Sequence, residues 1–126
     1  MAATVRHSIV VVDDREEMRE LLRTLLEYDD RFRVVGEAAD GLEAIDVVAR
    51  VRPDVVLLDH QMPRLTGIDA LGRLRSSSPE SKIMVLSNDP MVGREALARG
   101  ADAFRDKATS FDEIAGVLIG LVSAPA

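Results

Sequence analysis

The chain has 126 residues and a net charge of −6, with 47% hydrophobic, 30% charged and 3% aromatic residues. This length suits one domain with its own core, and the acidic balance disfavours nucleic-acid binding by that domain itself. No apolar run is long enough to span a membrane, and the lack of cysteine excludes disulfides and thiolate metal sites. With no signal peptide at the start, we expect a cytoplasmic protein.

Hydrophobic periodicity predicts strands and helices in alternation along the chain. Short apolar runs indicate five strands, at residues 8–12, 32–38, 55–58, 82–87 and 102–106. After each strand, apolar residues recur on one face of a helix. These helical patterns are marked in turn by Met18, Gly41, Ile68, Asp89 and Ser110. The alternation predicts a parallel α/β sheet covered by helices on both faces, which is favoured over an all-helical bundle.

The last two predicted helices carry capping signals. Asp89 stands as an N-cap before Pro90, and Gly100 marks the end of that helix. Ser110 and Glu113 have the spacing of a capping box. These signals predict where both helices begin.

Polar side chains follow four of the predicted strands at their carboxyl ends. Asp13 and Asp14 follow the first strand and Asp59 the third, while Ser87 and Lys107 follow the fourth and fifth. Taken singly, Asp14 and Ser87 can be caps, and Lys107 can be a surface lysine. In open α/β sheets, however, ligands bind beyond the carboxyl ends of the strands. The shared position of all five residues therefore favours one functional site.

The residue types at this edge indicate metal-assisted phosphoryl chemistry. Three close carboxylates repel one another unless a cation lies among them, and oxygen ligands without His or Cys favour Mg²⁺, or Mn²⁺ in its place. Asp59 is the best candidate nucleophile toward a phosphoryl group, because it stands alone on a central strand. Asp13 and Asp14 form a pair better suited to holding metal. Ser87 and Lys107 can bind phosphoryl oxygens.

Four segments resemble the receiver domains of two-component response regulators of the CheY type. These segments are VVDD (11–14), LLDHQMPRLTG (57–67), VLSN (85–88) and GADAFRDK (100–107). The resemblance implies a doubly wound (βα)5 domain with strand order 2-1-3-4-5 over residues 1–122, and residues 123–126 as a tail or the start of a linker. VVGEAADG (34–41) is most similar to receivers that precede a LuxR-type (NarL/FixJ-like) helix-turn-helix domain.

The resemblance also implies a role for each site residue. Asp59 would accept a phosphoryl group from a sensor histidine kinase, a phosphotransfer protein or a small donor such as acetyl phosphate. Asp13, Asp14, Asp59 and the backbone carbonyl of Gln61 would hold the metal. Ser87 and Lys107 would bind the phosphoryl group. The domain would catalyse its own phosphorylation and dephosphorylation without turning over an external substrate.

Further positions are expected to control the switch. Phe104 matches the aromatic switch of the family, although by itself it indicates only a core aromatic residue. With Ser87 it would reshape the face made by the fourth helix, fifth strand and fifth helix, and a homodimer on phosphorylation is one expected result. Gln61 and Asp89 match positions that influence phosphoryl lifetime, but we expect Asp89 to act mainly as a helix cap.

Other positions have simpler interpretations or depart from the family. We expect His60 to be a solvent-facing loop residue, turned away from Asp59 by side-chain alternation. Arg19 is expected on the solvated face of the first helix. Ala108 stands where the family usually has proline, so we expect a trans Lys107–Ala108 bond and a rearranged loop.

Two other classes of function remain open. One is a receiver-like scaffold that binds its partner without phosphorylation, although such domains generally lose an acid or the lysine. The other is a phosphatase working through an aspartyl phosphate, which would need a second acid where Gln61 stands. A flavodoxin-like or dinucleotide-binding domain is disfavoured, because no glycine-rich phosphate loop follows the first strand.

Overall fold

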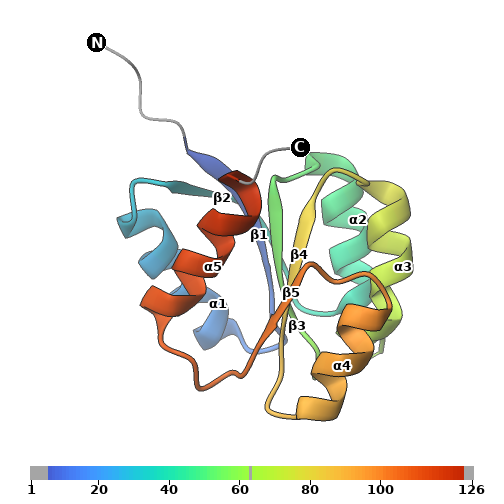
Figure 1. Ribbon diagram of the computed structural model, residues 1–126. Helices are drawn as coiled ribbons and strands as arrows, with labels where there is room; N and C mark the ends of the chain where they lie inside the picture. Colours follow the sequence, from blue (N-terminus) through green and yellow to red (C-terminus); the bar gives the residue numbers. More distant parts are fainter. Residues whose placement is uncertain (1–5, 63, 124–126) are drawn as a thin grey trace.

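A five-stranded parallel sheet forms the centre of the computed structural model, which describes residues 6–62 and 64–123. Its strands lie in the order β2-β1-β3-β4-β5 (Figure 1), so the predicted doubly wound topology is confirmed. The strands are β1 (His7–Val12), β2 (Phe32–Ala38), β3 (Val55–Asp59), β4 (Lys82–Leu86) and β5 (Ala103–Arg105). The fifth strand is shorter than predicted. Most of the expected tail, residues 124–126, lies outside the described residues.

Five helices cover the two faces of this sheet (Figure 1). Two core clusters, one on each face, show which helices pack where: α1 and α5 contribute to one, and α2, α3 and α4 to the other. The helices are α1 (Glu16–Tyr28), α2 (Gly41–Val51), α3 (Gly67–Ser77), α4 (Pro90–Ala98) and α5 (Phe111–Ser123). The prediction of helices on both faces is confirmed. Within the described residues, no helix has the length and apolar character needed to cross a membrane.

The central strands are apolar along their whole length because both of their faces are buried. On β1, Ile9 and Val11 pack against α1 and α5, whereas Val10 and Val12 pack toward α2 and α3. Successive side chains of a strand point to opposite faces, so a strand between two helical layers needs an apolar residue at every position. Burying this apolar surface is the main stabilisation of the domain.

Local hydrogen bonds set where most of the helices begin. The side chain of Asp89 accepts a hydrogen bond from the Met91 amide at 2.9 Å, with Pro90 at the first helical position, as predicted. Ser110 Oγ accepts from the Glu113 amide at 3.2 Å. At α1 the cap residue is Arg15, without a side-chain cap bond, so the alternative role of Asp14 as a helix cap is not supported.

Candidate functional site

The three predicted carboxylates meet at the carboxyl-terminal edge of the sheet, the lower edge in Figure 1. Strands β1 and β3 are neighbours in parallel register, with Val12 beside Leu58, and this brings the residues that follow them together. Each of Asp13, Asp14 and Asp59 offers a carboxylate oxygen within 4.8 Å of the others. Asp13 and Asp59 are buried, whereas Asp14 is exposed to solvent.

Lys107 reaches this cluster from the loop after β5. Its Nζ lies 2.7 Å from Asp59 Oδ1. No peptide bond in the described residues is cis, so the expected trans link to Ala108 is confirmed. The amide of Ala108, which a proline would lack, donates to Asp106 Oδ1 at 2.7 Å and closes the turn. The lysine therefore occupies the site despite the missing proline.

Asp59 is a buried acid whose two oxygens have different surroundings. Oδ1 pairs with Lys107 and accepts from the Gln61 amide at 3.3 Å, whereas Oδ2 is buried without a hydrogen-bond partner among the described residues. Burial raises the pKa of Asp59; Lys107 opposes this effect, and the nearby charge of Asp13 adds to it. An unpaired buried oxygen among three acids is a place for a hard cation, so these residues fit Mg²⁺.

Ser87 and Phe104 occupy the neighbouring strands. Ser87 is fully buried at the end of β4, where its Oγ accepts from the Asp89 amide at 3.1 Å. Phe104, on β5, is half-buried and lies over Gly93 of α4. A Cβ added at Gly93 would lie 2.4–2.8 Å from three ring atoms, which means that only glycine allows this close approach. The ring therefore packs directly on the helix next to Ser87.

Two expectations from the sequence are wrong. His60 is half-buried rather than solvent-facing, because its backbone amide donates to Leu86 and its carbonyl accepts from Gly67, and these bonds hold the loop against the sheet. Arg19 is only 18% exposed: it donates to the carbonyl of Asp13 at 2.8 Å and pairs with Glu37 at 3.4 Å. It supports the acidic loop from α1.

Sequence reasoning also missed a buried acid near the site. Asp40 caps α2 by accepting from the Glu43 amide at 2.9 Å, and it binds Arg64 of the β3–α3 loop through Nε at 2.9 Å. The spacing of Asp40 and Glu43 is a recognisable capping signal. The contact with Arg64 spans 24 residues and has no local signal in the sequence.

A cavity of about 460 Å³ adjoins the acidic cluster. Asp13 and Lys107 are among its lining residues, while most of its wall is apolar and comes from α1 and α5. The apolar lining includes Met18, Leu21, Leu22, Leu25, Phe111 and Ile114. Leu21 is 51% exposed, so this apolar surface continues to the outside.

Two curated proteins are similar in sequence to this chain. The uncharacterized transcriptional regulatory protein YhcZ of Bacillus subtilis is 39% identical over 108 residues, which cover 84% of this chain and 50% of the relative. A protein-glutamate methylesterase/protein-glutamine glutaminase of Pyrococcus abyssi is 46% identical over 77 residues, 61% of this chain and 21% of the relative. The chain thus spans half or less of these two curated relatives.

The fold is matched by a solved structure and by a family model. The signal receiver domain of NarL from Mycobacterium tuberculosis has a TM-score of 0.88 at 29% identity, and the match covers 96% of this chain and 99% of that one. The family model described as response regulator receiver domain matches residues 9–118. The predicted resemblance, including the similarity to NarL-type receivers, is confirmed. The chain belongs to the response regulator receiver domain family.

Proposed function

We propose that this receiver domain is a phosphorylation-controlled switch in two-component signalling, with Asp59 as its phosphoacceptor. One observation carries the proposal. Asp59 is buried, Lys107 pairs with one of its oxygens, and the other has no partner among the described residues beside two further acids. Such an oxygen is poised to bond to an electrophile once the surrounding negative charge is balanced.

The residues of the site divide the work of phosphoryl transfer. Asp13, Asp14, Asp59 and the Gln61 carbonyl would hold Mg²⁺, or Mn²⁺, which when bound supplies positive charge against the acids and the entering phosphoryl group. An oxygen of Asp59 forms the new bond to phosphorus. The bond from phosphorus to the donor's nitrogen or oxygen breaks, and its electron pair leaves with the donor.

Lys107 and Ser87 act on the transferred group. Lys107 Nζ lies 2.7 Å from Asp59 Oδ1, and its ammonium would pair with a phosphoryl oxygen once Asp59 carries the phosphoryl group. The Ser87 hydroxyl accepts the Asp89 amide through its oxygen, so its proton remains available for a phosphoryl oxygen. Gln61 and Asp89 lie two residues after Asp59 and Ser87, respectively, and we propose that they influence how soon water removes the phosphoryl group.

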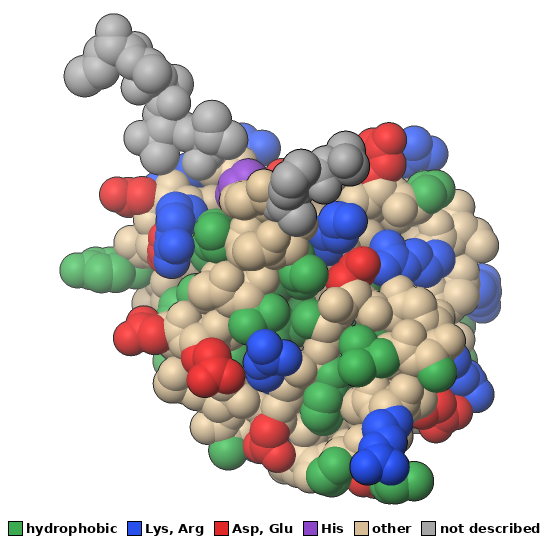
Figure 2. Space-filling view, in the orientation of Figure 1, with side chains coloured by type: hydrophobic (Ala, Val, Ile, Leu, Met, Phe, Trp, Pro, Cys, Tyr) green, Lys and Arg blue, Asp and Glu red, His purple; other side chains and the backbone are tan. Residues whose placement is uncertain are grey.

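Phosphorylation would be transmitted through α4 and β5. Movement of Ser87 toward the phosphoryl group would pull on the loop that begins α4, because its Oγ holds the Asp89 amide. Phe104 packs on Gly93 of the same helix and would change position with it. Figure 2 shows hydrophobic side chains between α5 and α4 on this face. A partner, an output domain or a second copy would bind there after phosphorylation.

The partners are proposed from the cavity and the relatives. A sensor kinase or phosphotransfer protein would place its phosphohistidine beside Asp59 and its apolar side chains in the cavity lined by α1 and α5.

The likeness to YhcZ and NarL supports a DNA-binding output domain, whereas the methylesterase relative supports a different one. The charge of −6 supports leaving DNA contact to such a domain. A cysteine-free chain suits the cytoplasm, where we propose it acts.

Intact mass spectrometry tests this proposal. The wild type and Asp59→Asn are incubated with acetyl phosphate, each with Mg²⁺ and with excess chelator. We expect one phosphoryl group on the wild type, formed only with Mg²⁺, and none on Asp59→Asn. An equal adduct on the variant would contradict the assignment of Asp59. If the wild type gains no phosphoryl group even from a phosphohistidine donor, the scaffold alternative takes its place.

A further inference from the structure

The β3–α3 loop is joined to the start of α2 by an ion pair between a buried acid and a largely exposed arginine, which the proposed mechanism does not use. Asp40 is only 3% exposed. Its Oδ1 accepts the Glu43 amide at 2.9 Å and caps α2, while its Oδ2 accepts Nε of Arg64 at 2.9 Å and also pairs with Nη2 of the same guanidinium. One carboxylate thus serves the helix with one oxygen and the loop with the other.

Arg64 makes these contacts with its backbone in an unfavourable conformation. Its φ is +67°, in the left-handed region that favours glycine. Arg52, at the end of α2, is the other non-glycine residue with positive φ, at +43°, among the described residues. No hydrogen bond or ion pair joins the Arg52 side chain to another described residue, so only Arg64 combines the strained backbone with a buried anchor.

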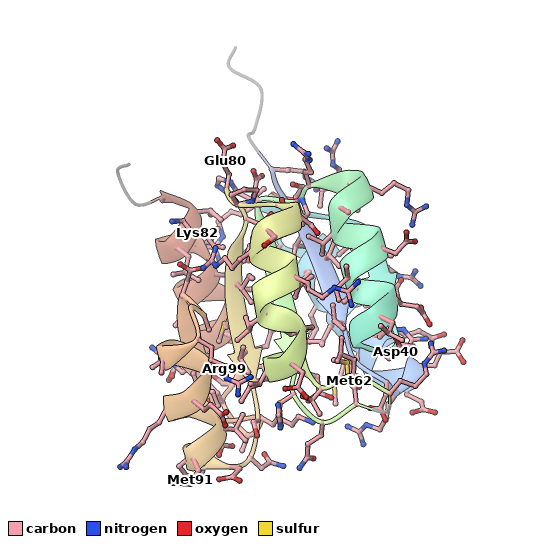
Figure 3. All side chains as sticks on the ribbon, turned by 90° about the vertical axis from the view of Figure 1, so that its right-hand side faces the viewer. Asp40, Met62, Glu80, Lys82, Met91 and Arg99 are labelled. Atoms are coloured by element: carbon pink, nitrogen blue, oxygen red, sulfur yellow. The ribbon has the colours of Figure 1, made fainter. Side chains whose placement is uncertain are left out.

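Backbone contacts next to the Asp40–Arg64 pair also hold the loop against α2. The Gly41 amide, next to Asp40, donates to the carbonyl of Leu65 at 3.1 Å. A Cβ added at Gly41 would lie 2.5 Å from that oxygen, so the loop rests directly on the start of α2. Figure 3 shows Asp40 and Met62 toward the same end of the molecule. Met62, which directly follows Gln61 in the sequence, is buried in the core and holds this side of the loop against the domain.

We infer that Asp40 and Arg64 are positioning residues for the phosphorylation of Asp59, holding the β3–α3 loop so that the Gln61 carbonyl is in place to complete the metal site. The inference rests on the proposed function. A loop fixed before the ion arrives does not lose its freedom on binding, so the ion binds more tightly. The Glu43 amide and the Arg64 guanidinium hold the pKa of Asp40 below its ordinary value, which keeps the pair ionised at neutral pH.

The variants separate the anchor from its structural side effects. Arg64→Gly removes the guanidinium and accepts the positive φ, so it is not expected to destabilise the backbone. Arg52→Gly is the matched control, with the same exchange at the other positive-φ arginine. Asp40→Asn keeps an oxygen to cap α2 but loses the charge that pairs with Arg64. The double variant Asp40→Asn with Arg64→Gly completes a cycle.

Three measurements are made on the unphosphorylated full chain: the Kd for Mg²⁺ by calorimetry, amide hydrogen exchange at Gly41 without metal, and unfolding by urea. We expect Arg64→Gly and Asp40→Asn each to weaken Mg²⁺ binding about tenfold, with no further loss in the double variant. Exchange at Gly41 should be faster in both, and Arg52→Gly should match the wild type. Labelling by acetyl phosphate at subsaturating Mg²⁺ should slow in parallel with the Kd.

Each result decides the matter. If Arg64→Gly binds Mg²⁺ as the wild type does, the positioning role is wrong, whatever happens to its unfolding free energy. Reduced stability with an unchanged Kd assigns the pair a purely structural role. A wild type that neither binds Mg²⁺ nor accepts a phosphoryl group overturns the proposed function, and the positioning role with it. A wild type that does both, alongside an unaffected Arg64→Gly, overturns the positioning role alone.

Discussion

At the amino-terminal edge of the sheet Asp54 and Asp102 each have hydrogen-bond partners, whereas at the carboxyl-terminal edge Asp59 keeps a buried oxygen without a partner among the described residues. Asp54 accepts the Ser8 amide at 2.9 Å and donates its own amide to Ser8 Oγ at 2.8 Å. Asp102 accepts the Ile83 amide at 2.7 Å and pairs with Arg75. The charged side chains at the amino-terminal edge therefore stabilise the fold, whereas those at the carboxyl-terminal edge remain available to bind a ligand. Removing an acid should therefore have opposite effects at the two edges.

The largest effect is expected from Arg75→Ala at the amino-terminal edge. Arg75 donates to the carbonyls of Gly100 at 2.7 Å and Ser81 at 2.6 Å and also pairs with Asp102, so it joins α3 to the segments before β4 and β5. Its loss should lower the free energy of unfolding by about 2–3 kcal/mol, as measured in urea. The Kd for Mg²⁺ should not change. A weaker Mg²⁺ affinity would show that the two edges are not independent.

At the other edge, Asp59→Asn should stabilise the metal-free protein. Burial and the charge of Asp13 raise the pKa of Asp59, with Lys107 only partly opposing them. A carboxyl group whose pKa is higher in the folded than in the unfolded protein contributes its whole stabilisation at a pH below the pKa of the unfolded state. That contribution is lost as the pH rises through the pKa of the folded state. Asn does not ionise, so the variant does not lose this stability. The loss in the wild type is about 1.4 kcal/mol for each unit by which the pKa of Asp59 differs between the folded and unfolded states.

Urea unfolding at a series of pH values checks this prediction. The advantage of Asp59→Asn over the wild type should be absent below the unfolded pKa and grow as the pH rises. Added Mg²⁺ should raise the melting temperature of the wild type but not of the variant. A variant less stable than the wild type at neutral pH would mean that the Lys107 pair outweighs burial and repulsion.

The opposite sign is expected for Asp54→Ala. This change removes the acceptor of the Ser8 amide and should lower the free energy of unfolding by about 1 kcal/mol at neutral pH. Thermal or urea unfolding of both variants in one buffer compares the two signs directly. If Asp54→Ala and Asp59→Asn shift stability in the same direction, the contrast between the edges fails.

The smallest effect is expected at the cap of α4. Asp89→Ala removes the acceptor of the Met91 amide and should cost about 0.5 kcal/mol, the lower end for an exposed helix cap. Asp89→Asn should retain most of the stability. Phosphoryl lifetime in the two variants then tests whether Asp89 also influences hydrolysis: a change in Asp89→Asn, whose cap is intact, would indicate a direct role.

The fold could be predicted because its signals are local. Continuous apolar strands, one-sided helices and the Asp89–Pro90 cap each depend on residues close in sequence. Strand β5 was predicted too long because the Asp102 side chain bonds to Ile83 and only Ala103–Arg105 pair with β4. The coming together of the three acids followed from topology, since the carboxyl ends of parallel strands share one edge.

The parts of the site that could not be predicted depend on long side chains that meet across the fold. Arg19 resembles a surface residue in the sequence, yet it reaches the Asp13 carbonyl. The Asp40–Arg64 pair joins two loops 24 residues apart. The prediction for His60 was wrong because the loop after it does not continue the strand. The loop folds back, and the Gly67 amide donates to the His60 carbonyl.

The most direct test of Asp59 as the phosphoacceptor is to locate the phosphoryl group. The wild type is phosphorylated with acetyl phosphate and Mg²⁺, the acyl phosphate is reduced with borohydride, and the peptides are sequenced by mass spectrometry. Reduction of an aspartyl phosphate leaves homoserine at the modified position. We predict homoserine at Asp59 alone. Homoserine at Asp13 or Asp14, or at no position in a protein that carries the phosphoryl group, would contradict it.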